Sequence, residues 1–275
     1  MKKRLYISLI FIFFLGPSFQ TIAQFTPEEV AERPKWEEYL KTAEIVDYWE
    51  MTSREAVTSP WVLTLEKDGI RRQALWKNPE GLLRGHLENW KWEIAAYRLD
   101  KYLGLNMVPP TVEKMFKGKR GSCQLWIDTW MDGRRKRREN IQIPSSKVSS
   151  WNKAMYLHYA FDNLIANEDR HSGNIKITKD WRIILIDHSR AFRTSEKFTK
   201  DLIYTERSKK RKKIMKKLSR AFVEKLKSLN FDLIKKIVGE YLIDRETEAV
   251  LIRKDLILKE IDKRIIKFGE DEVLY

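Results

Sequence analysis

Three polar residues at fixed spacing, Asp169, Asn174 and Asp187, restrict what this chain can fold into. Asp169 and Asn174 are five residues apart, and Asp187 stands thirteen residues further on, directly after the apolar run 184–186. One carboxylate can orient or deprotonate an attacking hydroxyl, while an amide oxygen and a second carboxylate are suitable ligands for divalent cations. Phosphoryl transfer needs this set of groups, so we expect a fold that brings both segments to one cleft.

The spacing itself supports this interpretation. Asp-x4-Asn is the spacing of the kinase catalytic loop, and an Asp after an apolar strand stands where kinases carry a metal-binding Asp. An isolated Asp-Arg-His would most often be an ion pair in a loop. The addition of Asn174 and Asp187, between a predicted helix and a predicted hairpin, favours the kinase-type interpretation.

The first half of the chain predicts a small antiparallel sheet with two helices. The first expected helix covers 26–43, with Thr26 as its N-cap and Pro27 at its first position. The second covers 87–103 and stops at Gly104. Runs rich in β-branched and aromatic residues predict strands at 45–51, 61–66, 70–77, 111–116 and 123–131. The Asp-Gly pair at 68–69 and the segment 117–121 are typical of hairpin turns.

The second half predicts mainly helices. Residues 132–150 have the composition of a loop, with five consecutive basic residues at 134–138. A helix is expected over 151–166, a small hairpin over 175–186, and an almost entirely helical segment from Asp201 onward.

The N-terminus predicts export. Basic residues at 2–4, an apolar run at 5–15, Gly16-Pro17 and the small residue Ala23 have the order of a secretory signal peptide, which we assign to residues 1–24. The apolar run is too short to span a bilayer, and no later stretch approaches the length of a membrane span. The single cysteine, Cys123, excludes an internal disulfide framework. We therefore expect a secreted or periplasmic protein, and a bacterial source fits these features.

The motifs together resemble a group of atypical kinases built around Asp-Arg-His-x-x-Asn and an Ile-Asp strand end. These are the phosphatidylinositol 3- and 4-kinases, the HipA-type kinases and the secretory-pathway kinases of the family with sequence similarity 20. The last group is most similar in the first half, where a strand ends in Lys77. There, residues 93–104 read Glu-x-Ala-Ala-x-x-Leu-Asp-x-x-Leu-Gly, and Val-Pro-Pro follows at 108–110. The resemblance extends over residues 45–193.

The resemblance implies an α+β fold with two lobes, as in protein kinases. Its small N-terminal lobe would be an antiparallel sheet with a helix and its C-terminal lobe mainly helical, with the active site between them near residues 125–132. We divide the chain accordingly into a signal peptide at 1–24, a kinase-like N-lobe at 25–132, a basic linker at 133–150 and a helical C-lobe at 151–275.

The resemblance also implies how ATP and Mg²⁺ or Mn²⁺ would be held. Lys77 would bind the nucleotide phosphates, and Glu93 would pair with Lys77 or help to hold metal. Asn174 and Asp187 would be metal ligands. A strand lysine or a helix glutamate alone is more often a surface residue, and only the loop motif favours these roles.

Two catalytic residues are implied as well. Asp169 would be the catalytic base or the residue that orients the hydroxyl. His171 has two open roles, because the histidine of this motif is implicated in proton transfer in the lipid kinases and is a buried structural residue elsewhere.

The sequence departs from the pattern in three places. The secretory-pathway kinases do not have an Asn at the position of Asn174, so this feature is closer to the lipid kinases. His-Ser-Arg follows Asp187 in place of Phe-Gly. No Gly-x-Gly-x-x-Gly occurs, and residues 52–60 would cover the phosphates instead.

The positive charge bears on the partner. The formal net charge is +15, and basic residues cluster at 134–138 and 207–217. These clusters suit a solvated surface or an acidic partner. No zinc finger, RNP motif or helix-turn-helix motif occurs, which argues against nucleic acid. The sequence therefore predicts an exported kinase for a hydroxyl-bearing or acidic substrate, whether protein, glycan or lipid head group. The alternative is a secreted pseudokinase that binds nucleotide or polyanions; the oligomeric state stays open.

Overall fold

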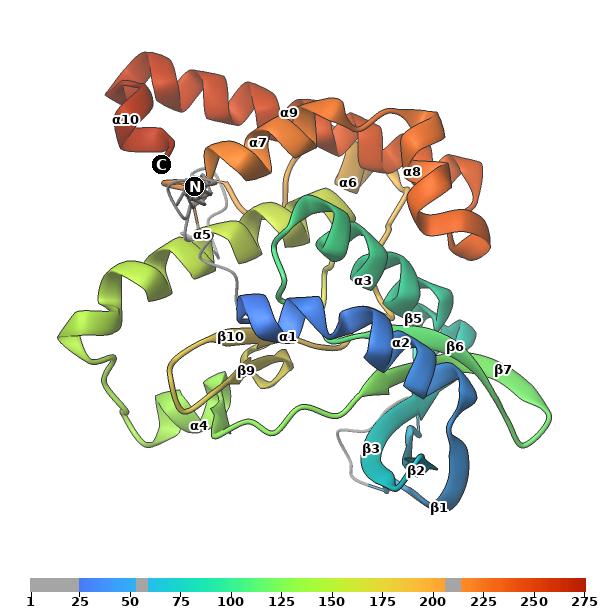
Figure 1. Cartoon of the computed structure of the whole chain (residues 1–275). Helices are drawn as coiled ribbons and strands as arrows, with labels where there is room; N and C mark the ends of the chain where they lie inside the picture. Colours follow the sequence, from blue (N-terminus) through green and yellow to red (C-terminus); the bar gives the residue numbers. More distant parts are fainter. Residues whose placement is uncertain (1–24, 53–58, 206–213) are drawn as a thin grey trace, which may run out of the picture.

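The computed structural model describes residues 25–52, 59–205 and 214–275 (Figure 1). The predicted signal peptide, most of the predicted phosphate loop (residues 53–58) and part of the second basic cluster (residues 207–213) lie outside the described residues. Among the helices that the structure describes, none is long and apolar enough to cross a membrane.

A five-stranded antiparallel sheet forms the N-terminal part, in the order β1-β2-β3-β7-β6. Its strands are β1 (Glu44–Glu50), β2 (Trp61–Lys67), β3 (Ile70–Lys77), β6 (Thr111–Phe116) and β7 (Lys119–Leu125). Asp68 and Gly69 both have positive φ, 51° and 72°, which is the backbone of a tight hairpin turn between β2 and β3. The Asp-Gly prediction is therefore confirmed.

Two short helices occur where one was expected, and the second of them covers the sheet. They are α1 (Pro27–Ala31) and α2 (Arg33–Thr42), and Thr26 caps α1 as predicted. A single helix over 26–43 was wrong because Pro34 has no N–H to donate to Val30, so the chain starts a new helix there. The α2 residues Tyr39 and Leu40 pack with sheet residues such as Leu63 and Trp76 in one buried cluster.

The C-terminal part is helical and encloses the larger core. Its helices are α5 (Val148–Ile165), α6 (Glu196–Lys200), α7 (Arg220–Ser228), α8 (Phe231–Val238), α9 (Asp244–Phe268) and α10 (Glu270–Val273). The predicted start of this helical segment at Asp201 was wrong. The described residues 201–205 and 214–219 are not helical, and α7 begins at Arg220.

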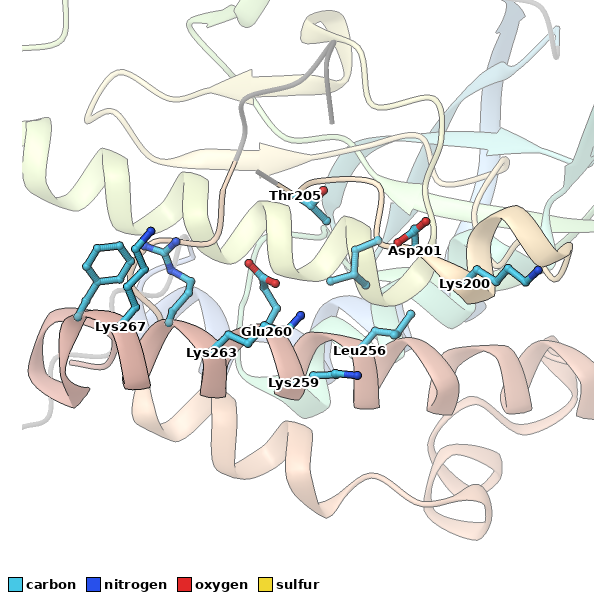
Figure 2. A pocket seen from close by; sticks show the side chains of 11 residues that line it. Lys200, Asp201, Thr205, Leu256, Lys259, Glu260, Lys263 and Lys267 are labelled. Atoms are coloured by element: carbon cyan, nitrogen blue, oxygen red, sulfur yellow. The ribbon is translucent and has the colours of Figure 1, made fainter. Parts of the chain in front are cut away.

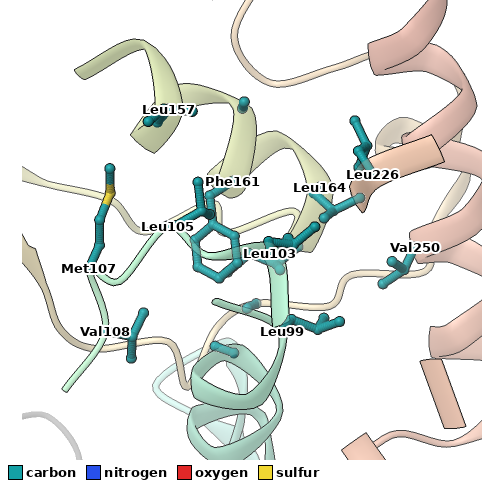
Figure 3. Close-up of a cluster of buried hydrophobic side chains, with 14 of the residues drawn as sticks. Leu99, Leu103, Leu105, Met107, Val108, Leu157, Phe161, Leu164, Leu226 and Val250 are labelled. Atoms are coloured by element: carbon teal, nitrogen blue, oxygen red, sulfur yellow. The ribbon is translucent and has the colours of Figure 1, made fainter. Parts of the chain in front are cut away.

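Helix α3 (Lys91–Leu103) connects the two parts. Figure 3 shows Leu99 and Leu103 of α3 beside Phe161 and Leu164 of α5, with Leu226 of α7 nearby. All of these side chains are buried. Gly104 ends α3 in the left-handed conformation, φ 72°, as the sequence predicted. Because α3 packs into the helical core, the functional side chains that it carries are fixed relative to α5.

Several boundaries differ from the expectation. Helix α3 starts at Lys91, four residues late, because the preceding residues pair as a hairpin of β4 (Glu80–Leu83) and β5 (His86–Asn89). The strand expected at 123–131 is β7, which ends at Leu125. A separate sheet contains β8 (Met131–Asp132), β9 (Ile175–Ile177) and β10 (Ile183–Leu185).

The basic segment expected as a loop contains a helix, α4 (Gly133–Arg138). The side chain of Asp132 accepts hydrogen bonds from the backbone N–H groups of Arg134 and Arg135, at 3.0 and 2.9 Å. This N-cap stabilises the start of α4, and ion pairs of Arg135 and Arg138 with Glu139 offset part of the repulsion among the basic side chains.

Candidate active site

Lys77, at the end of β3, lies at the centre of the site. Its Nζ forms ion pairs with Glu93 of α3 and, at 2.8 Å, with Oδ1 of Asp187 after β10. Burial alone would lower the pKa of Lys77, but Asp187 and Glu93 outweigh it and raise that pKa above its ordinary value. Burial opposes ionisation of both carboxyls too, yet Lys77 lowers their pKa values. All three groups are therefore charged at neutral pH, and we call them the cleft cluster.

Asn174 lies beside the cleft cluster, where its side chain faces Asp187. Asn174 Nδ2 lies 3.3 Å from Asp187 Oδ2. The backbone of Asp187 is left-handed, φ 64°, which is uncommon outside glycine. The next residue, His188, donates its backbone N–H to Glu93 at 3.0 Å. This bond ties the turn after β10 to α3 and holds Asp187 beside Lys77.

A second group of buried charges supports the loop that carries Asp169 and Asn174. Arg170 forms an ion pair with Asp162 of α5 at 3.0 Å and donates to the backbone carbonyls of Asn174 and Ile186. His158 contacts Asp162 at 2.8 Å. Burial would raise the pKa of Asp162, but Arg170 and His158 lower it well below its ordinary value. We call His158, Asp162 and Arg170 the sealed cluster.

Asp169 points into the cleft above the sealed cluster. Its Oδ2 lies 3.2 Å from Nη1 of Arg190, and the side chain is 35% exposed. Arg190 in turn forms an ion pair with Glu88 of β5. Sequence reasoning did not assign Glu88 or Arg190 a role, because they are 102 residues apart and neither belongs to a recognised motif.

His171 lies at the mouth of the cleft. Its Nδ1 accepts a hydrogen bond from the backbone N–H of Gly173 at 3.1 Å and so caps the 3₁₀ turn η2 (Ser172–Asn174). Arg134 of α4 lies 3.3 Å from the same nitrogen. Burial, and next the charge of Arg134, lower the pKa of His171. Gly173 permits this packing, because a Cβ there would lie 2.6 Å from Arg134 Nε.

The predicted site residues meet around one cavity of about 400 Å³. Lys77, Asp169, His171, Asn174 and Asp187 all line it, and Glu93 stands behind Lys77. A cavity of about 320 Å³ adjoins it, with an apolar lining of Met51, Leu75, Leu125, Trp126, Ile184 and Ile186. The structure thus brings all six predicted residues together, next to a space suited to a flat apolar group. Their chemical roles stay predictions.

The donors in the cleft fit a hard divalent cation. Within the described ranges, no three His, Cys, Asp or Glu side chains are grouped to hold a metal without help. Asp187 and Asn174 supply two oxygen donors side by side, provided that the Asn174 amide turns its oxygen toward Asp187. Mg²⁺ in phosphoryl-transfer sites is commonly held by one or two protein ligands together with substrate phosphates. The residues present therefore fit Mg²⁺ or Mn²⁺ bound together with a nucleotide.

No protein-family description and no curated protein sequence matches the chain. Solved structures do. Hydra Fam20, determined with sugar, superposes with a TM-score of 0.62 at 16% identity, over 91% of this chain and 93% of that one. The Golgi casein kinase superposes with a TM-score of 0.60 at 16% identity, over 91% and 78% of the two chains. Its structure with Mn and ADP gives 0.61 at the same identity.

The chain has the Fam20 kinase fold. The predicted α+β fold of two lobes is confirmed by these structures and by the sheet and helices described above. The resemblance to the family with sequence similarity 20 is also confirmed, as regards the fold. At 16% identity the Fam20 likeness concerns the fold alone, so the chemistry has to be argued from this chain's own residues.

Proposed function

We propose that the protein is an ATP- and divalent-metal-dependent kinase that transfers phosphate to a hydroxyl acceptor outside the cytoplasm. One observation carries the proposal: Lys77 is held between Glu93 and Asp187 at the wall of a cavity that Asp169 and Asn174 also line. The known structure of a protein with this fold that contains Mn and ADP supports the choice of nucleotide and metal.

The nucleotide would occupy the two adjoining cavities. The base would lie in the apolar cavity between Leu75 and Ile186, and the phosphates would extend toward Lys77. The raised pKa of Lys77 keeps it protonated, so it can bind a phosphate oxygen as a cation. Asn174 and Asp187 would hold the cation, which when bound neutralises the charge on the transferring phosphate.

Asp169 would act on the acceptor. Its carboxylate opens to the cleft, where it can accept a hydrogen bond from the attacking hydroxyl and orient it toward the phosphate. Arg170, bound to Asp162, fixes the backbone between Asp169 and Asn174, so that base and metal ligand keep their separation.

The acceptor class and the compartment belong to this proposal. The names of the similar structures, one with sugar and one a casein kinase, support a glycan or protein hydroxyl over a lipid head group. The predicted signal peptide supports export, and mass spectrometry of the secreted protein should find its N-terminus after Ala23 or Gln24.

The test is phosphate transfer from labelled ATP by purified protein with Mg²⁺ or Mn²⁺, offered protein, glycan and lipid pools. We expect one pool to be labelled by the wild type and by Asp232→Asn, an exposed control on α8. Asp169→Asn should lose the labelling. A wild type that neither binds ATP nor transfers phosphate with any metal would overturn the proposal.

A second candidate function is polyanion binding without catalysis, and one surface favours it. Figure 2 shows a cavity of about 380 Å³ along α9, away from the cleft. Its charged lining is Lys200, Asp201, Lys259, Glu260, Lys263, Arg264 and Lys267. Lys259, Lys263 and Lys267 repeat every four residues on one helix face, and none forms an ion pair with a carboxylate that the structure describes. Like charges at this spacing destabilise a helix slightly, and an anionic ligand would relieve that repulsion.

This candidate is tested by binding of the sulfated glycan heparin. The triple variant Lys259→Gln, Lys263→Gln, Lys267→Gln should weaken binding and reduce its salt dependence. The matched control replaces three other exposed lysines, Lys119, Lys147 and Lys236, and keeps the same net charge. Equal losses in both variants would mean that net charge alone attracts the glycan, which would remove this candidate.

A further inference from the structure

The hairpin β4–β5 carries a buried carboxylate that the proposed reaction has not yet used. Glu88 on β5 is 1% exposed, although its side chain lines the cleft cavity. One of its oxygens pairs with Nε of Arg190. The other, Oε2, is buried and has no hydrogen-bond partner among the residues that the structure describes. Burying a carboxylate oxygen without a hydrogen-bond partner costs free energy. Glu88 has such an oxygen, and it lies close to Asp169, the predicted catalytic base.

Arg190 connects Glu88 to Asp169. Its Nε lies against Glu88, and its Nη1 lies 3.2 Å from Asp169 Oδ2. The Arg190 side chain is only 14% exposed, so this geometry is held by its surroundings. Among the described side chains, none binds the other oxygen of Asp169. Arg190 therefore fixes one carboxylate oxygen and leaves its partner for an acceptor hydroxyl.

The backbone keeps this arrangement in register. Asn89, next to Glu88, donates its N–H to the carbonyl of Ser189, next to Arg190, at 2.9 Å. Ser189 Oγ also lies 3.2 Å from Asp187 Oδ1. The hairpin is thus joined to the same turn that carries Asp187, and a displacement of β5 would move Arg190 and Asp169 together.

We propose that Glu88 is a positioning residue for the reaction: through Arg190 it sets the orientation of the Asp169 carboxylate toward the acceptor hydroxyl. This inference rests on the proposed kinase function. The guanidinium is a rigid planar fork of donors, so its contacts with the two carboxylates have fixed angles, whereas a lysine ammonium is a point charge on a flexible stem. Misorientation of a catalytic group by about 1 Å can cost roughly 100-fold in rate.

The test is the steady-state kinetics of Glu88→Gln, Arg190→Gln and the double variant, with Glu80→Gln as control. Glu80 lies on β4 of the same hairpin, is exposed and pairs with Asn89 across the strands. We expect Glu88→Gln to lower kcat by about 10- to 100-fold and to leave the KM for ATP nearly unchanged, because Lys77, Asn174 and Asp187 are intact. The double variant should be no slower than Arg190→Gln, since both changes break one chain of contacts.

The outcomes separate the two proposals. A wild type without phosphate transfer overturns the kinase function and this inference with it. An active wild type with unchanged kcat in Glu88→Gln overturns this inference alone, as would multiplied losses in the double variant. A raised KM for ATP in both single variants would also overturn it, by showing that Arg190 binds the nucleotide. Thermal unfolding and ATP binding, measured on each variant, distinguish a lost orientation from a general loss of structure.

Discussion

The cleft cluster and the sealed cluster pair the same kinds of charge and differ in what can reach them. In the sealed cluster, the side chains of His158, Asp162 and Arg170 are all fully buried. In the cleft cluster, Lys77 and Glu93 are 7% and 1% exposed, but Asp187 is 37% exposed. The exposed carboxylate of Asp187 is therefore the main difference between the clusters. The sealed cluster can only stabilise the fold, whereas the cleft cluster can also bind a ligand.

The first prediction breaks the sealed cluster. Asp162→Asn keeps the shape of the side chain but leaves Arg170 buried without its carboxylate, and we expect the free energy of unfolding to fall by about 3–5 kcal/mol. Urea unfolding of wild type and variant measures the change, with Asp232→Asn on the surface of α8 as the control. A loss below about 1 kcal/mol would mean that the backbone carbonyls of Asn174 and Ile186 hold Arg170 without Asp162.

The second prediction breaks the cleft cluster. Asp187→Asn removes a proposed metal ligand and one partner of Lys77, while Glu93 still pairs with Lys77. We expect phosphate transfer to fall by about 100- to 1000-fold, the usual cost of one preorganised electrostatic contact. The change in stability should be smaller than for Asp162→Asn, because solvent already reaches Asp187. If Asp187→Asn unfolds as easily as Asp162→Asn, the comparison between the clusters fails.

The sequence predicted the cleft cluster far better than the sealed one. Asp187 lies in a motif whose spacing from Asp169 and Asn174 has chemical meaning, and the resemblance to the atypical kinases then indicated that Lys77 and Glu93 lie beside it. Asp162 gave no such signal, because a carboxylate in a helix is usually solvated. Its burial follows from how α5 packs against the loop that carries Arg170, which no local pattern encodes.

The same distinction, between local sequence patterns and tertiary packing, explains which helix and strand boundaries were predicted correctly. The turn at Asp68-Gly69 was predictable because its positive φ values depend on those two residues alone. The hairpin β4–β5 was not, since Leu87 and Trp90 fit a helical period with the following residues. Pairing of His86 with Leu83 across the turn decided the conformation instead. Glu88 was missed for this reason, and its contact with Arg190 depends on the tertiary structure.

The third prediction tests the ion pairing in the sealed cluster through the pH dependence of stability. Arg170 and His158 overcome the effect of burial and lower the pKa of Asp162 in the folded protein below its ordinary value of 3.8. Its stabilising effect is therefore complete above about pH 4 and is lost as the pH falls through the lower, folded pKa. The stability difference between wild type and Asp162→Asn should narrow below about pH 4, by at most about 1.4 kcal/mol per pH unit. A constant difference from pH 7 to pH 2 would contradict the ion pairing.

The smallest expected effect concerns His171, which lies at the mouth of the cleft and whose role is either structural or catalytic. Its ring caps η2 by accepting from Gly173, and its pKa is lowered by burial and by Arg134, so it is neutral at pH 7. Asn can accept the same hydrogen bond, whereas Ala cannot. If the ring is structural, His171→Asn should keep phosphate transfer within about 10-fold of wild type, and His171→Ala should lose about 1 kcal/mol of stability. If the ring carries the proton, both variants should lose the 100-fold or more of general acid–base catalysis. They should also lose the acid limb of the pH–rate profile. That result would mean that His171 is a catalytic residue together with Asp169.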